Sequence, residues 1–200
     1  MKKISLICVI LVLIVAVGCF ASCVDTSDKL REINMALNSE YSKIELNVST
    51  ASDEVTLKSN FVITNVDGNT NISYEVERLN GFGTDNSAPS EFISVVKGSA
   101  VVKDNAIISV DGGELSQSIL LGVADYDSMV FRTAYFGEIK AGSSGISALV
   151  REPKKFMQDD NFDGTDMTVD VRMSGSYIKS ITINYVLNDS NVSLDYNFTR

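Results

Sequence analysis

The sequence predicts an α+β fold: one antiparallel sheet of about eight strands, with an N-terminal helix and a second helical region packed on one face. Two patterns predict it. After residue 43, apolar residues recur at every second position through most of the chain, as in strands with one buried and one wet face. In two other segments they recur three and four residues apart, as on a helix face. No internal repeat or second domain boundary divides the chain.

The first predicted element is a helix over residues 25–42. Asp25, Thr26 and Ser27 offer N-caps, and Asp28 suits the positive end of the helix dipole. One face of this helix carries the apolar residues Leu30, Ile33, Leu37 and Tyr41.

Strands are predicted next over residues 43–50, 54–66 and 71–79. Asp67-Gly68 separates the last two as a tight turn, because both residues tolerate positive φ. A polar loop over 80–90 follows, and residues 92–96 are apolar. A hairpin over Asp104-Asn105 then joins residues 99–103 to 106–110.

The middle of the chain predicts the second helical region. Over residues 127–140 the apolar side chains lie mostly three and four apart, which favours a helix over a strand. Residues 146–150 are short and suit either a strand or a helical turn. Pro153 is well placed to begin a helical turn that runs to Met157. Three strands over 167–173, 177–187 and 192–199 complete the predicted sheet.

The N-terminus has the features of an export signal. Lys2 and Lys3 precede an apolar run that ends at Gly18-Cys19. The segment Ala16-Val17-Gly18-Cys19 resembles a bacterial lipobox, although Leu is usual where Ala16 stands. This resemblance implies a signal peptide over 1–18, a lipidated Cys19 with a tether over 19–27, and a single α+β domain over 28–200. It also implies an exported protein anchored at the cell envelope or the outer face of a membrane.

Three alternatives to this interpretation remain open. Cys23 ends a poorer lipobox, because the bulky Phe20 stands in it. The apolar stretch over 4–22 is just long enough to span a bilayer as an uncleaved anchor. Ordinary secretory cleavage near Gly18 or Ser22 would release a secreted protein.

Composition excludes several classes of function. The formal charge is −9, and without Lys2 and Lys3 it is −11, so nucleic acid is an unfavourable partner. The chain has no His, which excludes Ser-His-Asp and Cys-His catalysis and His-ligated zinc. Cys8, Cys19 and Cys23 are its only cysteines, so no disulfide supports the domain. We expect a protein that is not an enzyme. A hydrolase that uses a pair of carboxylates is a third possibility, but nothing in the sequence singles out such a pair.

The lipobox and the order of helix, strands, helical segment and three final strands resemble the LolA/LolB/LppX-type envelope lipoproteins. The resemblance implies that the sheet is curved like a half-barrel and holds acyl chains on its concave face. Alternation selects the inward strand residues as a lining, with core packing as the competing role. A face filled by Leu37, Phe131, Tyr135 and Phe136 would contradict lipid carriage. The candidate lining residues are Leu57, Phe61, Ile63, Tyr74, Val76, Tyr185, Tyr196 and Phe198.

One acidic segment matches part of a calcium loop. Asp159, Asn161 and Asp163 followed by Gly164 alternate as in the first half of an EF-hand loop, whose oxygen ligands Ca²⁺ prefers. Asp170 stands at the twelfth position, where the longer Glu is expected. These four residues are candidate ligands of a weak calcium site. The alternative is a solvated acidic loop, and no other cofactor is predicted.

These observations lead to an expected function. We expect a non-enzymatic, membrane-tethered envelope lipoprotein that binds an apolar ligand or lipid. The alternative is an extracellular interaction or adhesion module that uses the calcium loop. The sequence identifies neither the ligand nor a protein partner.

Overall fold

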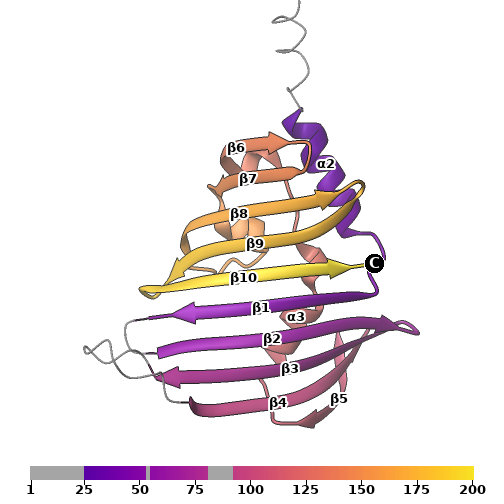
Figure 1. Ribbon diagram of the computed structural model, residues 1–200, viewed down its shortest axis with the longest axis vertical. Coiled ribbons are helices and arrows are strands. Elements are labelled where there is room, and N and C mark those ends of the chain that lie inside the picture. Colours follow the sequence, from indigo (N-terminus) through magenta and orange to yellow (C-terminus); the bar gives the residue numbers. More distant parts are fainter. Residues whose placement is uncertain (1–24, 53–54, 81–91) are drawn as a thin grey trace, which may run out of the picture.

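The computed structural model describes residues 25–52, 55–80 and 92–200. They form one open antiparallel sheet of ten strands with a few helices, in the order β5-β4-β3-β2-β1-β10-β9-β8-β7-β6 (Figure 1). The predicted α+β class and antiparallel sheet are confirmed, but the expected number of about eight strands is wrong. The predicted signal peptide and Cys19 lie outside the described residues.

The strands and helices have the following bounds. The first five strands are β1 (Lys43–Ala51), β2 (Val55–Val66), β3 (Asn69–Asn80), β4 (Phe92–Lys103) and β5 (Ala106–Gly112). The last five are β6 (Phe136–Gly142), β7 (Gly145–Val150), β8 (Thr165–Ser174), β9 (Tyr177–Leu187) and β10 (Ser190–Thr199). The helices are α2 (Thr26–Leu37), α3 (Gln117–Ala124) and α4 (Pro153–Met157), with 3₁₀ turns η1 (Tyr126–Ser128) and η2 (Thr133–Tyr135).

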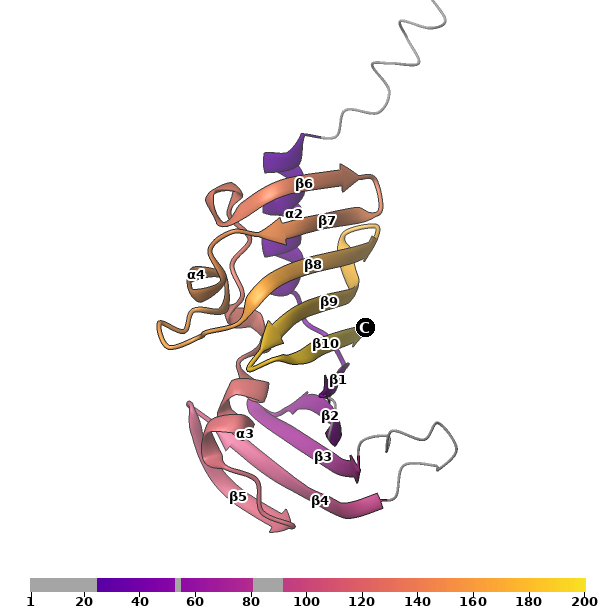
Figure 2. The same ribbon diagram turned by 90° about the vertical axis from the view of Figure 1, so that its left-hand side faces the viewer.

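The sheet consists of two meanders that meet in its centre. Strands adjacent in sequence pair within β1–β5 and within β6–β10, and β1 pairs with β10 to join the two sets. Because β5 and β6 lie at opposite edges, the chain between them must cross the sheet, a width of about 43 Å at 4.8 Å per strand. That crossing segment carries α3, η1 and η2 on the same side as α2 and α4. Figure 2 shows β3, β4 and β5 turned toward α3.

The two predicted hairpin turns are confirmed. Asp67 and Gly68 have φ values of 51° and 75°, and Asp104 and Asn105 have 48° and 61°. Positive φ at both central residues is the conformation that matches the twist of the flanking strands. These turns therefore fix the β2–β3 and β4–β5 registers, with Val66 opposite Asn69 and Lys103 opposite Ala106.

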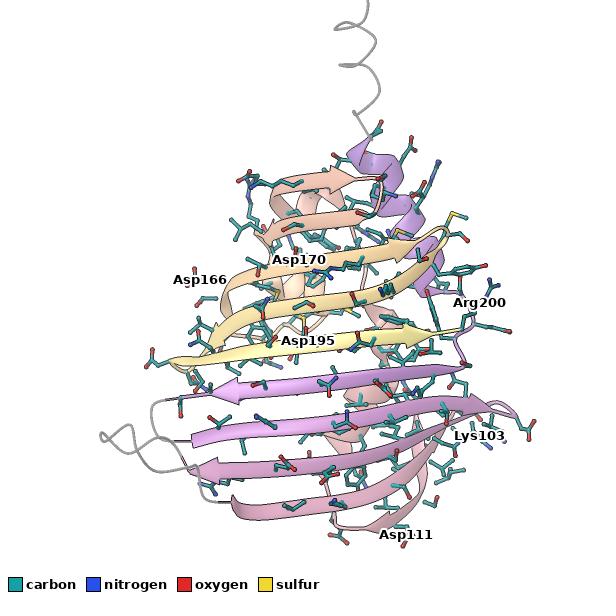
Figure 3. All side chains as sticks on the ribbon, viewed as in Figure 1. Lys103, Asp111, Asp166, Asp170, Asp195 and Arg200 are labelled. Carbon is teal, nitrogen blue, oxygen red and sulfur yellow. The ribbon has the colours of Figure 1, made fainter. Side chains whose placement is uncertain are left out.

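The register separates the sheet into a polar and an apolar face. One cross-strand row on the helix-facing side consists of Tyr196, Leu46, Phe61 and Tyr74, all buried. The neighbouring row on the other side is polar across nine strands. It contains Lys140, Ser147, Asp170, Thr182, Asp195, Asn47, Asn60, Glu75 and Lys97. Figure 3 shows Asp170 and Asp195 on this solvent face.

Helix α2 is shorter than predicted and is held to the sheet by side-chain hydrogen bonds. Asp25 caps it by accepting from the Ser27 N–H, and it ends at Leu37 instead of residue 42. Tyr41 lies beyond the helix but is buried, and its hydroxyl donates to the Ala36 carbonyl and accepts from the Ile178 N–H. Asn34 makes two 2.8 Å hydrogen bonds with the backbone of Phe131, which fix the crossing segment to α2.

The predicted helix over 127–140 is wrong. That segment holds η1, η2 and the first residues of β6, and residues 146–150 lie in β7. A shift in the β6–β7 register between Phe136 and Ile139 places two apolar residues three apart in a strand, which mimics helical spacing. The second helical region is instead α3, which begins after the cap Ser116 and buries Leu120 and Val123. The short helix from Pro153 to Met157 is confirmed.

Candidate functional site

The eight predicted lining residues lie on the helix-facing side of β2, β3, β9 and β10, but they differ in burial. Five are core residues: Phe61, Ile63, Tyr74, Tyr196 and Phe198. Val76 and Tyr185 are half-buried. Leu57 is 39% exposed, although it lies four residues before the buried Phe61 on the same face of β2.

The helix-facing side over β6–β9 is filled by core side chains. The rings of Phe131, Phe136 and Phe156 pack with centroids 5.3–5.9 Å apart, and Leu37 of α2 is buried beside the sheet. These include three of the four residues whose packing we expected to exclude a lipid, the fourth being the half-buried Tyr135. This packing counts against acyl-chain carriage on that part of the face, as stated above, so a ligand on the helix-facing side would have to bind outside it.

One cross-strand row at the other end of β2 is less covered. Leu57 pairs with Thr50, Thr50 with Val192, and Val192 with Tyr185, so these four side chains lie side by side across β2, β1, β10 and β9. We call them the open row. Val192 is buried, whereas Leu57 is exposed and Thr50 and Tyr185 are half-buried. Phe162 covers Tyr185 at a ring distance of 5.1 Å.

Two tyrosine hydroxyls near the open row have no hydrogen-bond partner among the described residues. They belong to Tyr185 in the row and to Tyr196, which lies on the same face of β10 four residues beyond Val192. Burial raises the pKa of Tyr185, and burial with the nearby Tyr185 raises the pKa of Tyr196 to about 12. The Tyr196 side chain is only 8% exposed, but its hydroxyl oxygen keeps some contact with solvent, since it is not among the fully buried oxygens without a partner.

The acidic segment does not assemble the predicted calcium ligands. The Asp159 carboxylate accepts from the Asn161 backbone N–H, and Asp163 pairs with Lys154 at 3.4 Å. Asp170 lies within β8 on the solvent face, opposite Ser147 and Thr182. Within the described ranges, no three acidic or cysteine side chains are grouped to hold a metal ion.

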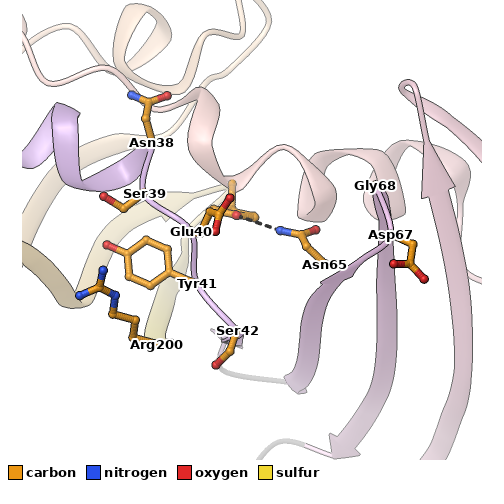
Figure 4. A pocket seen from close by; sticks show the side chains of 10 residues that line it. Asn38, Ser39, Glu40, Tyr41, Ser42, Asn65, Asp67, Gly68 and Arg200 are labelled. Carbon is orange, nitrogen blue, oxygen red and sulfur yellow. Dashed lines mark hydrogen bonds between the residues drawn. The ribbon is translucent and has the colours of Figure 1, made fainter.

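A second candidate site is a polar hollow that was not predicted. It has a volume of about 880 Å³ and lies where the connection from α2 to β1 faces the β2–β3 turn (Figure 4). Its lining consists of Asn38, Ser39, Glu40, Tyr41, Ser42, Asn65, Asp67, Gly68, Tyr126 and Arg200. The residues come from four distant parts of the sequence. Only the polar run from Asn38 to Ser42 groups several of the lining residues together in the sequence.

The wall of this hollow is ordered by hydrogen bonds and ring contacts. The Asn65 amide donates to the Tyr126 hydroxyl at 3.5 Å, and Tyr41 packs on Phe198 at a ring distance of 4.8 Å. The Arg200 guanidinium lies 3.9 Å from the centre of the Tyr177 ring, a cation–π geometry. Burial raises the pKa of Tyr126 and of Tyr41, so both phenols stay neutral near pH 7.

Comparisons with known proteins provide no assignment. No protein-family model matches the chain, and no curated protein matches it. In the part of the chain that the structure describes, no helix combines the length and apolar character needed to cross a bilayer.

Proposed function

We propose that the protein is an exported, membrane-tethered binding protein that is not an enzyme and holds an apolar or amphipathic ligand on the open row. The open row is the observation that supports the ligand most directly. It places the exposed Leu57 in the same cross-strand row as the buried Val192, with Thr50 of β1 between them, on the helix-facing side of the sheet. Exposed aliphatic surface that adjoins a core gains from being covered by another apolar group.

The two tyrosines give the proposed ligand a polar end. Tyr185 and Tyr196 each present an aromatic ring with a hydroxyl that no described residue binds. A carbonyl or hydroxyl on the ligand would satisfy these hydroxyls, and orienting polar groups within an apolar lining are typical of ligand sites. The filled region under α2 restricts the ligand to a short chain or to one end of a longer chain.

The proposed tether would fix the orientation of the molecule. Five residues separate Cys19 from Asp25, so an extended chain would span at most about 22 Å between them. A lipid on Cys19 would therefore hold the start of α2 close to the membrane. In Figure 1 the start of α2 lies beside β6, so β5 would point away from the membrane.

The tether is tested by substitution of the two candidate cysteines. We expect Cys19→Ala to move the protein from the membrane fraction to the soluble fraction or to leave its signal uncleaved, whereas Cys23→Ala leaves a lipidated membrane protein. Mass spectrometry of the purified protein identifies the acylated residue. An unmodified Cys19 in a membrane-bound wild-type protein would exclude this tether.

The ligand site is tested with a fluorescent fatty-acid analogue. Leu57→Asp should weaken binding of the analogue by about tenfold or more, because it puts a charge in the open row. Leu149→Asp is the matched control, since Leu149 is 49% exposed but lies on the solvent face of β7. Equal binding by both variants would contradict a site at the open row.

A further inference from the structure

The polar hollow carries charged groups that no described residue neutralises. Arg200, Glu40 and Asp67 line it, and none of them makes an ion pair or side-chain hydrogen bond with a described residue. Most other charged side chains near α2 are paired, as in Lys29 with Glu32 and Arg31 with Asp28. The hollow thus has one unpaired cation and two unpaired anions.

The cation is held in place in a way that leaves its hydrogen-bonding edge available. The Arg200 guanidinium lies over the Tyr177 ring at 3.9 Å, and this cation–π contact uses the charge of the group and not a hydrogen bond from its N–H donors. Those donors match a carboxylate in a two-point geometry. In the view of Figure 4, Arg200 lies on one side of Tyr41 and Glu40 on the other.

We propose that this hollow binds a small zwitterion, either a free amino acid or the end of a short peptide. Its carboxylate binds the Arg200 guanidinium, and its ammonium group binds the Glu40 carboxylate. Asp67, farther along the hollow, adds negative potential on the ammonium side. The amides of Asn38 and Asn65 and the hydroxyls of Ser39 and Ser42 supply neutral hydrogen bonds around the ligand.

The balance of charge favours a zwitterion over a simple ion. Counted over side chains, one guanidinium and two carboxylates give the lining a net formal charge of −1, which disfavours an anion without an ammonium group. A cation alone would leave Arg200 unsatisfied. The volume of about 880 Å³ lies within the range of small-molecule sites, roughly 300–1,000 Å³.

This site is distinct from the open row. Leu57 and Asn65 belong to the same strand, β2, and are eight residues apart, or about 27 Å in extended backbone. If binding experiments contradict one of the two sites, the proposal for the other site is therefore unaffected.

The test is calorimetric titration of the protein, purified from bacteria after export, with four probes: L-alanine, trialanine, acetate and methylammonium. We expect L-alanine or trialanine to bind, and acetate and methylammonium to bind much more weakly or not at all. Tighter binding of trialanine would identify a peptide end as the ligand, and tighter binding of L-alanine a free amino acid. Absence of heat with both zwitterions, or equal binding of a single-charge probe, would overturn the proposal.

Variants locate the binding in the hollow. Arg200→Gln and Glu40→Gln should each weaken zwitterion binding by about tenfold or more, the loss expected for one charge-assisted hydrogen bond. Arg31→Gln and Glu138→Gln remove the same charges at exposed positions outside the hollow and should leave affinity unchanged. An equal loss in the control variants would show that net charge, not the hollow, controls binding, and would overturn the proposal.

Discussion

At the scale of single residues, two buried tyrosines are expected to have different roles. Tyr41 stabilises the fold, whereas the Tyr196 hydroxyl is available to a ligand. The Tyr41 hydroxyl bonds two backbone groups, whereas the Tyr196 hydroxyl has no partner among the described residues. We expect Tyr41→Phe to lower the free energy of unfolding by about 1–3 kcal/mol, because it removes the acceptor of the buried Ile178 N–H, whereas the Ala36 carbonyl still accepts from the Ser39 N–H. Tyr196→Phe should change it by less than about 0.5 kcal/mol. Urea unfolding of both variants measures the difference, and an equal cost would contradict this assignment.

The same tyrosines predict how stability changes at alkaline pH. The pKa of Tyr196 is raised to about 12 from 10.0, and the pKa of Tyr41, Tyr74, Tyr126 and Tyr185 is raised as well. Below pH 10 a phenol is protonated in both states and contributes no pH dependence. Above pH 10 the unfolded chain loses phenolic protons that the folded chain retains, so folding stability falls. Urea midpoints measured from pH 9 to 11 should therefore decrease, and Tyr196→Phe should flatten the decrease; a constant midpoint would contradict the burial of these phenols.

At the scale of elements, the β6–β7 hairpin depends on one glycine. Gly145 has a φ of 143°, and a Cβ there would overlap the carbonyl oxygen of Val171 in β8. We expect Gly145→Ala to destabilise the protein by about 2–4 kcal/mol, because it separates β7 from β8. Gly142→Ala is the control from the other end of the same turn, where a Cβ meets no atom within 4 Å. Thermal unfolding of the pair checks this, and a neutral Gly145→Ala would show that β7 is not held in this register.

The elements also show which structure could be predicted from the sequence. Strands with strict alternation, such as β9 over Tyr177–Leu187, have the bounds that were predicted, because a half-buried strand leaves a period of two. The β6 strand was missed because its irregular register changes that period. Helix α3 was missed because its exposed Ile119 and buried Leu120 are adjacent, so its apolar residues do not mark one face.

The candidate sites were less predictable than the elements. Alternation identified the face that carries Leu57 and Tyr185, but not which part of that face the helices cover, since coverage depends on where the crossing segment packs. The polar hollow depends on β1 pairing with β10, which brings Arg200 near the connection after α2. Nothing in the local sequence indicates that pairing.

At the scale of the whole molecule, the pairing of β1 with β10 makes the sheet one structural unit. The core includes side chains from both meanders, such as Ile44 and Phe198, which pair directly. We expect a single cooperative unfolding transition. If either meander unfolded, the other would be left with β1 or β10 as an unpaired edge strand whose apolar side chains are exposed. Differential scanning calorimetry checks this, and two separate transitions would show that the meanders fold independently.

The central claim is that an apolar or amphipathic ligand occupies the open row, and native mass spectrometry of the protein purified from bacteria tests it most directly. The account predicts a bound species that dissociates on collisional activation, that is present in Leu149→Asp and that is depleted in Leu57→Asp. A wild-type protein with only its own mass, which also fails to take up added fatty acid, would contradict the claim.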